Sequence, residues 1–439
     1  MSNLYSRRRV IEMGLGSFAG LSILGLAACG GSGGGTTSST GNITLQLFFW
    51  GAASRDKLTR QAIDLYQQKY ANVKISSQFT DFTQYWNKLN TQIAGNAAPD
   101  LIQMDMRYIA QFVQKKLLLD LTPYISDKTI DLADFDQGLL KSSEVNNTPY
   151  GIPMGGNYQG LFYDTEMIKQ ANVGEPQDGM TWDQFADYTT KVAKALGSGM
   201  YGVTDLSGDI TSFEVWTRQH NKELYTTDGK LGFTEQDVID WFTYWDKLRK
   251  AGGAIPTDVQ AGFGTSGNPD ATGLVHGKAA FHLTYSNLID AFQKSVKHKL
   301  AIVSVPTGST PGMYLKPSML MSISAKTKHP KESANFIGFI NNDPGAVKAL
   351  SVERGTPGSA KARQLLVPTL TATQQVMMDY FERVGKSNFT RPKLVLDPAG
   401  AGEVEKALLR NAQNVGFGKV SIADGAKAFY ADAQKAIGA

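Results

Sequence analysis

"TPYGIPMGGNYQGLFYDTEMIKQANV", Thr148–Val173, lies where the character of the sequence changes. Two short extended pieces flank Pro153-Met154-Gly155-Gly156, and the two glycines permit backbone conformations that other residues resist. One series of strand-helix units precedes this stretch and another follows it. Because 439 residues are too many for one ordinary core, we expect the stretch to connect two α/β domains.

On the N-terminal side, β-branched and aromatic runs alternate with helical patterns. "ITLQLFFW" (43–50), "VKISSQFT" (73–80) and "PDLIQMD" (99–105) are predicted strands. Helices are expected to begin at Ser54, at Thr83 and near Arg107, and Gly95 is expected to end the second of them. Strands at intervals of roughly 27–30 residues with helices between them predict right-handed βαβ units in a parallel sheet.

On the C-terminal side, Thr181 and Gln184 form a capping box that predicts the start of a helix. "HGKAAFHLTYSN" (276–287) and "AIVSVPTG" (301–308) follow as extended segments. "SMLMSISAKTKHPKESANFIGFINN" (318–342) is then expected to form a strand, a polar turn and a helix.

Composition excludes several classes of function. The net charge is only +4 and no lysine-arginine block follows Arg9, so we expect no nucleic-acid partner. The five histidines show no metal-ligand spacing, and no glycine-rich phosphate loop follows a strand, so neither a metal nor a cofactor is expected. With one cysteine, an internal disulfide is impossible.

The N-terminus has the pattern of an export signal. A basic segment, Ser6–Ile11, precedes a glycine-broken apolar run that is short for a membrane helix, which favours a secretory signal peptide over residues 1–28. Ser-Arg-Arg-x-Val-Ile also resembles a twin-arginine signal, and the general secretion route is the alternative. Leu26-Ala27-Ala28-Cys29 resembles the bacterial lipoprotein box, which implies that Cys29 is acylated and that residues 29–41 form a flexible linker.

The folded part resembles the extracellular solute-binding proteins of ABC importers, in particular the carbohydrate-binding group called family 1. The resemblance runs from Asn42 to the end, through "APDLIQMD", "YGIPMGGNYQGLFYDTEMI", "TWDQFADYTTKVA", "GKAAFHLTYSN", "VSVPTG", "SISAKTKHPKESANFIGFINNDPGA", "RGTPGS" and a C-terminal helix. Each motif is degenerate alone, but their order behind a lipoprotein signal is specific.

This resemblance implies a two-lobed α/β fold of the type II periplasmic-binding-protein kind. Each lobe would hold a mainly parallel sheet flanked by helices, and the chain would cross the hinge three times. Lobe 1 would comprise 42–154 plus 304–350, and lobe 2 would comprise 155–303 plus 351–439. The crossings would fall at Pro153–Asn157, near Val303–Pro306 and near Glu353–Thr356.

The resemblance also implies a function and a place of action. A monomeric receptor, held by its lipid on the extracellular face of the membrane, would bind a carbohydrate in the inter-lobe cleft. An oligosaccharide is favoured over a monosaccharide, and the partners would be ABC permease subunits. Phe49-Trp50-Gly51 with Arg55 and "MD" after the third strand is similar to binders of plant or acidic oligosaccharides. After "GKAAF" the family often carries Gly-x-Trp, whereas this chain has Tyr285-Ser286-Asn287, so Tyr285 is the candidate for the stacking role.

The candidate ligand-binding residues are aromatic, polar or basic side chains at strand ends and crossings, together with one glycine. Aromatic rings cover the apolar faces of a sugar, while carboxylates, amides and guanidinium groups bind its hydroxyls. Each candidate has a structural alternative: packing for the aromatic residues, helix capping for the aspartates, and a solvated charge or a salt bridge for the arginines. The set is Trp50, Gly51, Arg55, Asp81, Asp105, Asn157, Tyr158, Trp216, Tyr285 and Arg354.

The alternative function is a lipid-anchored, secreted carbohydrate-active enzyme. Glycoside hydrolysis needs two carboxylates that face each other across a cleft. Asp81 and Asp105 are the one pair that the predicted strand ends supply, and both also suit helix capping.

Overall fold

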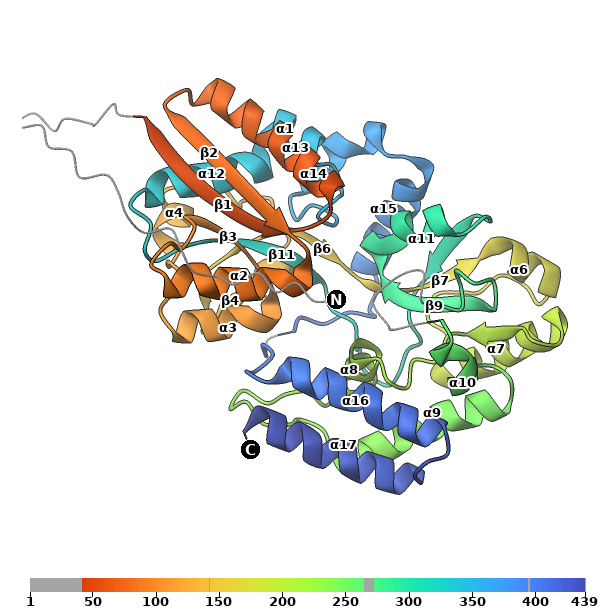
Figure 1. Cartoon of the computed structure of the whole chain (residues 1–439). Coiled ribbons are helices and arrows are strands. Elements are labelled where there is room, and N and C mark those ends of the chain that lie inside the picture. Colours follow the sequence, from red (N-terminus) through yellow and green to blue (C-terminus); the bar gives the residue numbers. More distant parts are fainter. Residues whose placement is uncertain (1–41, 142, 264–271, 394, 439) are drawn as a thin grey trace, which may run out of the picture. The chain divides into compact units, whose positions relative to one another are not determined.

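The structure, a computed structural model, describes residues 42–141, 143–263, 272–393 and 395–438. The predicted signal peptide, Cys29 and the linker to residue 41 lie outside these residues. From residue 42 onward the chain forms one compact unit with two separate sheets (Figure 1). None of its described helices is long and apolar enough to cross a bilayer.

Sheet 1 has five strands in the order β2-β1-β3-β11-β6. Their bounds are β1 Ile43–Trp50, β2 Val73–Thr80, β3 Leu101–Met104, β6 Ile152–Asn157 and β11 Lys316–Ile323. The first two strands match the predicted segments in full, because uninterrupted β-branched and aromatic runs suit a buried sheet. The strands β2 and β3 pair parallel to β1, whereas β11 pairs antiparallel to both β3 and β6.

Helices cover both faces of sheet 1. The chain moves outward from β1 to β2 and then back past β1 to β3, so right-handed crossovers place α1 and α2 on opposite faces (Figure 1). The larger helices here are α1 Ala53–Lys69, α2 Phe82–Ala94, α3 Met106–Gln114, α12 Pro330–Asn342 and α13 Pro344–Leu350; between α3 and β6 lie α4 Thr122–Ser126, α5 Gln137–Lys141, β4 Glu144–Val145 and β5 Thr148–Pro149.

Two predicted helix starts need correction. Ala52, and not Ser54, is the N-cap of α1, and no side chain caps that helix. The cap of α2 is Asp81, so this helix starts one residue before Thr83. The capping box of Thr181 and Gln184 is confirmed at the start of α7, and Gly95 is confirmed as the C-cap of α2.

Sheet 2 has four strands in the order β10-β7-β9-β8. Their bounds are β7 Gln159–Asp164, β8 Tyr201–Val203, β9 Ala279–Tyr285 and β10 Leu300–Val303. The strand β7 pairs antiparallel to β9 and β10, and β8 pairs parallel to β9. Both sheets are mixed, yet each has a single opposing strand, β11 in sheet 1 and β7 in sheet 2, so the expectation of two mainly parallel sheets is confirmed. The opposing strand of each sheet is the one that the chain enters from the other sheet, and it runs antiparallel to both of its neighbours.

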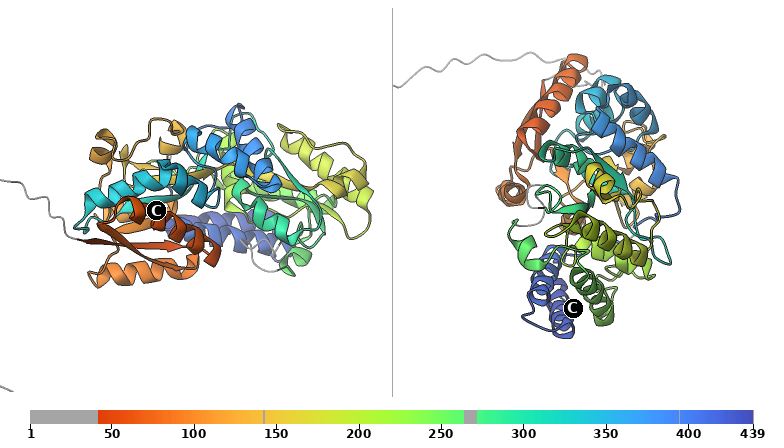
Figure 2. Two further views of the ribbon diagram at one scale, coloured as in Figure 1. Left: turned by 90° about the horizontal axis from the view of Figure 1, so that it is seen from above. Right: turned by 90° about the vertical axis from the view of Figure 1, so that its right-hand side faces the viewer.

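Ten helices and two short 3-10 turns accompany sheet 2 and the third crossing in the described chain. Among them α16 and α17 lie side by side, joined by a short turn and by the ion pair of Arg410 with Asp432 (Figure 2). The bounds are α6 Thr165–Ala171, α7 Trp182–Leu196, α8 Ile210–Gln219, α9 Glu235–Lys250, α10 Thr257–Ala261, η2 Ser286–Leu288, α11 Ile289–Ser295, α14 Ala360–Leu366, η3 Val367–Thr369, α15 Ala372–Gly385, α16 Ala401–Gly416 and α17 Ile422–Ile437.

The glycine-rich crossing is held by backbone pairing. The chain passes from β6 to β7 through Tyr158 alone. Gly156 and Thr356 exchange two backbone hydrogen bonds, of 2.7 and 3.1 Å, which tie this crossing to the later one. A side chain at Gly155 would place its Cβ 2.7 Å from the carbonyl oxygen of Arg354, so the position requires glycine for close approach.

The segment 304–315, which connects β10 to β11, stays with sheet 2. The backbone of Thr307 donates to the carbonyl oxygen of Met180, and the Gln219 side chain donates to that of Pro306. The chain therefore rejoins sheet 1 only at Lys316, the first residue of β11.

His282 on β9 generates a prediction about pH. Its ring stacks on Phe292 at 5.2 Å, and its Nδ1 has no hydrogen-bond partner among the described residues. Burial lowers the pKa of His282 to about 4, although Asp209 opposes the effect. Between pH 6.5 and 4 the unfolded chain therefore binds a proton that the folded chain does not, and folding weakens as the pH falls.

We expect His282→Gln to remove this contribution. Between pH 7 and 4, the wild type should lose on the order of 2 kcal/mol of unfolding free energy more than the variant does. Urea unfolding at a series of pH values measures the difference. An equal loss in both proteins would show that His282 titrates normally in the folded chain.

Candidate functional site

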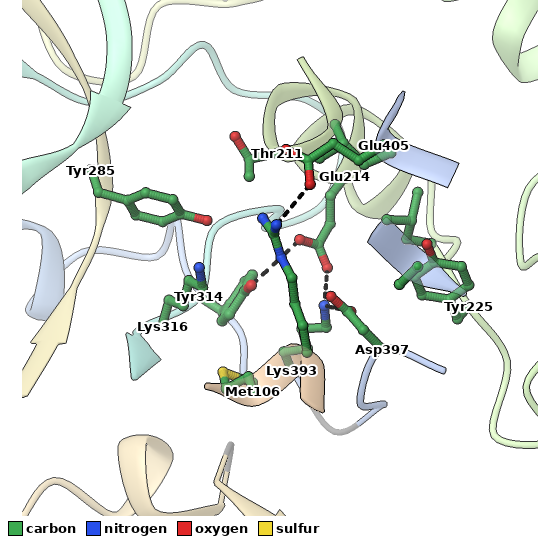
Figure 3. Close-up of a pocket in the computed structure, with 14 residues that line it drawn as sticks. Met106, Thr211, Glu214, Tyr225, Tyr285, Tyr314, Lys316, Lys393, Asp397 and Glu405 are labelled. Carbon is green, nitrogen blue, oxygen red and sulfur yellow. Dashed lines mark hydrogen bonds and ion pairs between the residues drawn. The ribbon is translucent and has the colours of Figure 1, made fainter. Parts of the chain in front are cut away.

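A pocket lies between the carboxyl end of β3 in sheet 1 and the helices α8 and α16 of the sheet 2 side (Figure 3). About 440 Å3 of space between the surrounding side chains holds no protein atoms, and this volume includes open solvent. Three tyrosines and six charged residues give it a polar and aromatic lining. The lining residues are Met106, Arg107, Ile210, Thr211, Glu214, Leu224, Tyr225, Tyr285, Tyr314, Lys316, Lys393, Asp397, Ala401 and Glu405.

Strand direction explains how three of these residues meet. Arg107 is the second residue of α3, just beyond the carboxyl end of β3. Because β11 is antiparallel to β3, its first residue, Lys316, lies at this same edge. Tyr285 is the last residue of β9 in sheet 2, so its ring enters the pocket from the other side.

An ion pair crosses the pocket from one side to the other. The Nη1 atom of Arg107 on α3 lies 2.7 Å from Oε2 of Glu405 on α16. The side chains remain 28 % and 41 % exposed, so solvent reaches this pair and limits its contribution to stability.

Lys393 forms a second, buried ionic cluster. Its ammonium lies 2.6 Å from a carboxylate oxygen of Glu214 and 2.6 Å from one of Asp397. Burial alone would lower the pKa of Lys393, but the two carboxylates outweigh it and hold that pKa above its ordinary value. Burial likewise opposes ionisation of Asp397, and Lys393 nevertheless lowers its pKa. The Tyr314 hydroxyl donates to Glu214 at 3.4 Å and so joins this buried cluster, which forms one side of the pocket.

Two groups on the opposite side of the pocket lack partners. The Lys316 ammonium makes no hydrogen bond or ion pair within the described ranges, and it lies 4.6 Å from the centroid of the Tyr285 ring. The Tyr285 hydroxyl is buried and has no hydrogen-bond partner among the same residues. Burial lowers the pKa of Lys316, an effect that the charge of Asp105 partly offsets. These groups are therefore available to a ligand.

Tyr285 is the one predicted site residue that lines this pocket in the described part of the chain. Trp50 is 8 % exposed and packs against Phe82, Tyr85 and Trp86, with ring centroids 5.1 to 5.8 Å away. Its role as a stacking platform stays a prediction, and its packing in sheet 1 is what the structure describes.

Gly51 and Arg55 follow Trp50 and contact each other. A side chain at Gly51 would meet that of Arg55 at 2.5 Å. The Nε of Arg55 donates to both carboxylate oxygens of Glu353, at 2.9 and 2.8 Å, and its Nη1 donates to the Trp50 carbonyl at 3.0 Å. Arg55 thus makes the salt bridge that was the structural alternative to a ligand contact.

Asp81 and Asp105 both cap helices. The Asp81 carboxylate accepts the backbone N–H of Gln84 at 3.0 Å, and that of Asp105 accepts the backbone N–H of Arg107 at 2.9 Å. This capping satisfies N–H groups at the starts of α2 and α3. Burial acts to lower the pKa values of Arg107 and Lys316, and the negative charge of Asp105 acts to raise them.

Asn157, Tyr158 and Arg354 lie at the paired crossings and are each at most 5 % exposed. The Arg354 guanidinium donates to the Thr59 hydroxyl at 2.6 Å, while its Nε and Nη1 atoms have no partner among the described residues. Tyr158 packs against Phe381 at 5.3 Å. None of these three residues belongs to the pocket lining.

Trp216 on α8 belongs to an aromatic cluster of the sheet 2 side. Its ring centroid lies 5.2 to 5.6 Å from those of Trp182, Trp241 and Tyr244. Its neighbours Thr211 and Glu214 on the same helix line the pocket, but Trp216 does not.

The charged lining residues were missed from sequence. A lysine immediately before the apolar strand "PSMLMSI" was the available signal for Lys316. Lys393 and Asp397 are four residues apart, but their partner Glu214 comes from a distant segment that no local spacing relates to them. The described residues contain no group of three or more histidine, cysteine or acidic side chains arranged to hold a metal ion.

Comparisons with known proteins include a family model and solved structures of solute-binding proteins. A family model described as bacterial extracellular solute-binding protein matches residues 61–377. A solved structure of an extracellular solute-binding protein family 1 member from Alicyclobacillus acidocaldarius is 32 % identical, with a TM-score of 0.75, over 91 % of this chain and 100 % of that one.

Two further relatives are more distant. The periplasmic oligogalacturonide binding protein of Yersinia enterocolitica, solved with saturated digalacturonic acid, is 21 % identical with a TM-score of 0.76, over 90 % of this chain and 99 % of that one. The multiple sugar-binding protein of Streptococcus mutans is 22 % identical over 388 residues, which cover 79 % of this chain and 85 % of the relative.

The buried cluster at Lys393 generates a stability prediction. Replacing Lys393 by methionine would leave two buried carboxylates without their cation, so the unfolding free energy should fall by about 3 kcal/mol or more. Lys406→Met is the matched control, because Lys406 pairs with Glu403 in solvent, and it should cost less than about 1 kcal/mol. Urea unfolding compares the two variants, and equal losses would contradict a structural role for the cluster.

Proposed function

Because the chain belongs to the bacterial extracellular solute-binding protein family, we propose that it is the carbohydrate receptor of an ABC importer. It captures a sugar or oligosaccharide in the pocket between its two lobes and delivers it to permease subunits in the membrane. The observation that carries this proposal is the pocket itself, which combines tyrosine rings, unpaired polar groups and side chains from both sheets.

The lobes are proposed as predicted, with two changes. Residues 155–157 join lobe 1, since they belong to β6 of sheet 1. Residues 304–315 join lobe 2, because the Thr307 backbone donates a hydrogen bond to Met180 and the Pro306 carbonyl accepts one from the Gln219 side chain. In the structure Arg107 of lobe 1 already meets Glu405 of lobe 2, and Lys316 of lobe 1 meets Tyr285 of lobe 2, as expected of closed lobes. The ligand would stabilise the closed state through its higher affinity for that state.

Tyr285 supplies the aromatic surface in this proposal. A tyrosine ring buries the C–H face of a sugar, and the unpaired hydroxyl can bond to one of its oxygens. The neighbouring Tyr225 and Tyr314 add further aromatic lining. Glu214 and Asp397 do not support glycoside hydrolysis here, because both share the Lys393 ammonium.

Thermal unfolding of the purified protein with a panel of neutral and acidic mono- and oligosaccharides tests this function. A true ligand at 100 times its dissociation constant should stabilise the chain by about 2.7 kcal/mol and raise the melting temperature accordingly. Tyr285→Ala should weaken binding of that ligand by about tenfold or more, since it removes the ring and the hydroxyl.

Trp216→Phe is the control, because Trp216 packs in its own aromatic cluster and should leave the affinity unchanged. If Trp216→Phe lost sugar binding while Tyr285→Ala kept it in full, the sugar would not bind in the pocket that Tyr285 lines. Cleavage of one oligosaccharide without any stabilisation would favour the enzyme instead.

We also propose that the receptor is exported and held on the extracellular side of the membrane by a lipid on Cys29. The signal-like segment and the Leu26-Ala27-Ala28-Cys29 sequence support this. Cys29→Ser should move the protein from the membrane fraction to the soluble fraction of expressing bacteria, as measured by immunoblotting. Retention of the variant in the membrane at wild-type levels would exclude the cysteine as the anchor.

A further inference from the structure

We propose that the pocket is built for an acidic sugar, whose carboxylate binds the Lys316 ammonium and the Tyr285 hydroxyl. This inference rests on the proposed receptor function and names the chemical class of its ligand. The starting observation is that the two groups lie together, with the Lys316 Nζ atom 4.6 Å from the centroid of the Tyr285 ring.

Lys316 differs from the other two cations of the pocket. Arg107 is neutralised by Glu405 at 2.7 Å, and Lys393 is shared by two carboxylates at 2.6 Å. Lys316 has no such partner in the part of the chain that the structure describes. A desolvated ammonium without a counter-ion is costly, and the face of a tyrosine ring compensates only part of that cost.

The Tyr285 hydroxyl adds a second unsatisfied group. It is buried without a hydrogen-bond partner in the described chain, which is unfavourable relative to a bonded hydroxyl. A ligand oxygen that accepts from both Tyr285 and Lys316 removes both penalties at once. A carboxylate presents two such oxygens and carries the charge that Lys316 lacks.

The charges of the pocket are separated in space. Lys316 and Tyr285 lie on one side, whereas Glu214 and Asp397 lie on the other, around Lys393 (Figure 3). The carboxylates of the far side already pair with Lys393, and the Asp105 carboxylate already caps α3. A ligand carboxylate on the near side therefore meets one unpaired positive charge, which favours a monoanion over a phosphate dianion.

Binding to matched sugar pairs tests this assignment. The probes are oligosaccharides of galacturonate, glucuronate and mannuronate, each compared by calorimetry with its neutral galactose, glucose or mannose counterpart of the same length and linkage. At least one uronate should bind about tenfold or more tighter than its neutral counterpart, because a charge-assisted hydrogen bond is stronger than a neutral one.

Variants of the two residues identify the subsite. Lys316→Met should weaken uronate binding by about 30-fold or more while changing binding of the neutral counterpart by less than about threefold, since it removes only the charge partner. Tyr285→Phe keeps the ring and should weaken uronate binding by about fivefold, the effect of one hydrogen bond. Lys316→Arg should retain most of the preference. Lys328→Met, an exposed lysine outside the pocket lining, is the control.

The outcomes separate this inference from the receptor function. Stabilisation by neutral oligosaccharides alone would leave the receptor in place and overturn the acidic-sugar subsite. Unchanged uronate affinity in folded Lys316→Met would overturn the subsite as well. An equal response to sodium acetate at the same concentration would mean that the pocket takes any carboxylate and would overturn the sugar assignment. Absence of binding by every sugar would overturn both proposals.

Discussion

The backbone pairing of Gly156 with Thr356 is the constraint on which the two-sheet arrangement depends. It joins the end of β6 to a segment 200 residues later in the chain, at the point where Tyr158 alone separates sheet 1 from sheet 2. Gly155 has to lack a side chain there, because the Arg354 carbonyl occupies the space. Two crossings held together in this way place the ends of β3, β9 and β11 around one pocket.

The pocket contains charged side chains that are paired with each other and one that is not. Lys393 with Glu214 and Asp397 is closed on itself and contributes to stability, while Arg107 and Glu405 reach across from opposite sides in partial contact with solvent. Lys316 and Tyr285 remain unpaired beside them. Such unpaired groups favour ligand binding, because a buried polar group without a hydrogen bond gains more free energy from a ligand than one that is already bonded.

Much of the fold was predictable because its signals are local. The strands at 43–50 and 73–80 and the capping box at Thr181 follow from runs and spacings of a few residues. The direction of β11 was not predictable from its own residues, since it depends on the chain returning from the other sheet. Of the candidate site residues, Tyr285 lines the pocket, Trp50 and Trp216 lie in aromatic clusters, and Asp81 and Asp105 cap helices; their roles in ligand binding stay predictions.

Three features follow from the sequence alone, because each rests on neighbouring residues or on ordered short motifs. They are the alternation of strands and helices, a crossing close to residues 153–157, which the structure places at Tyr158, and the resemblance to solute-binding proteins. Which charges are paired follows only from the three-dimensional fold. Lys316 and Lys393 look alike in the sequence, yet Lys393 meets the nearby Asp397 and the distant Glu214, whereas Lys316 meets an aromatic face. Pairing of charges depends on distances across the fold, and those distances are set by long-range packing.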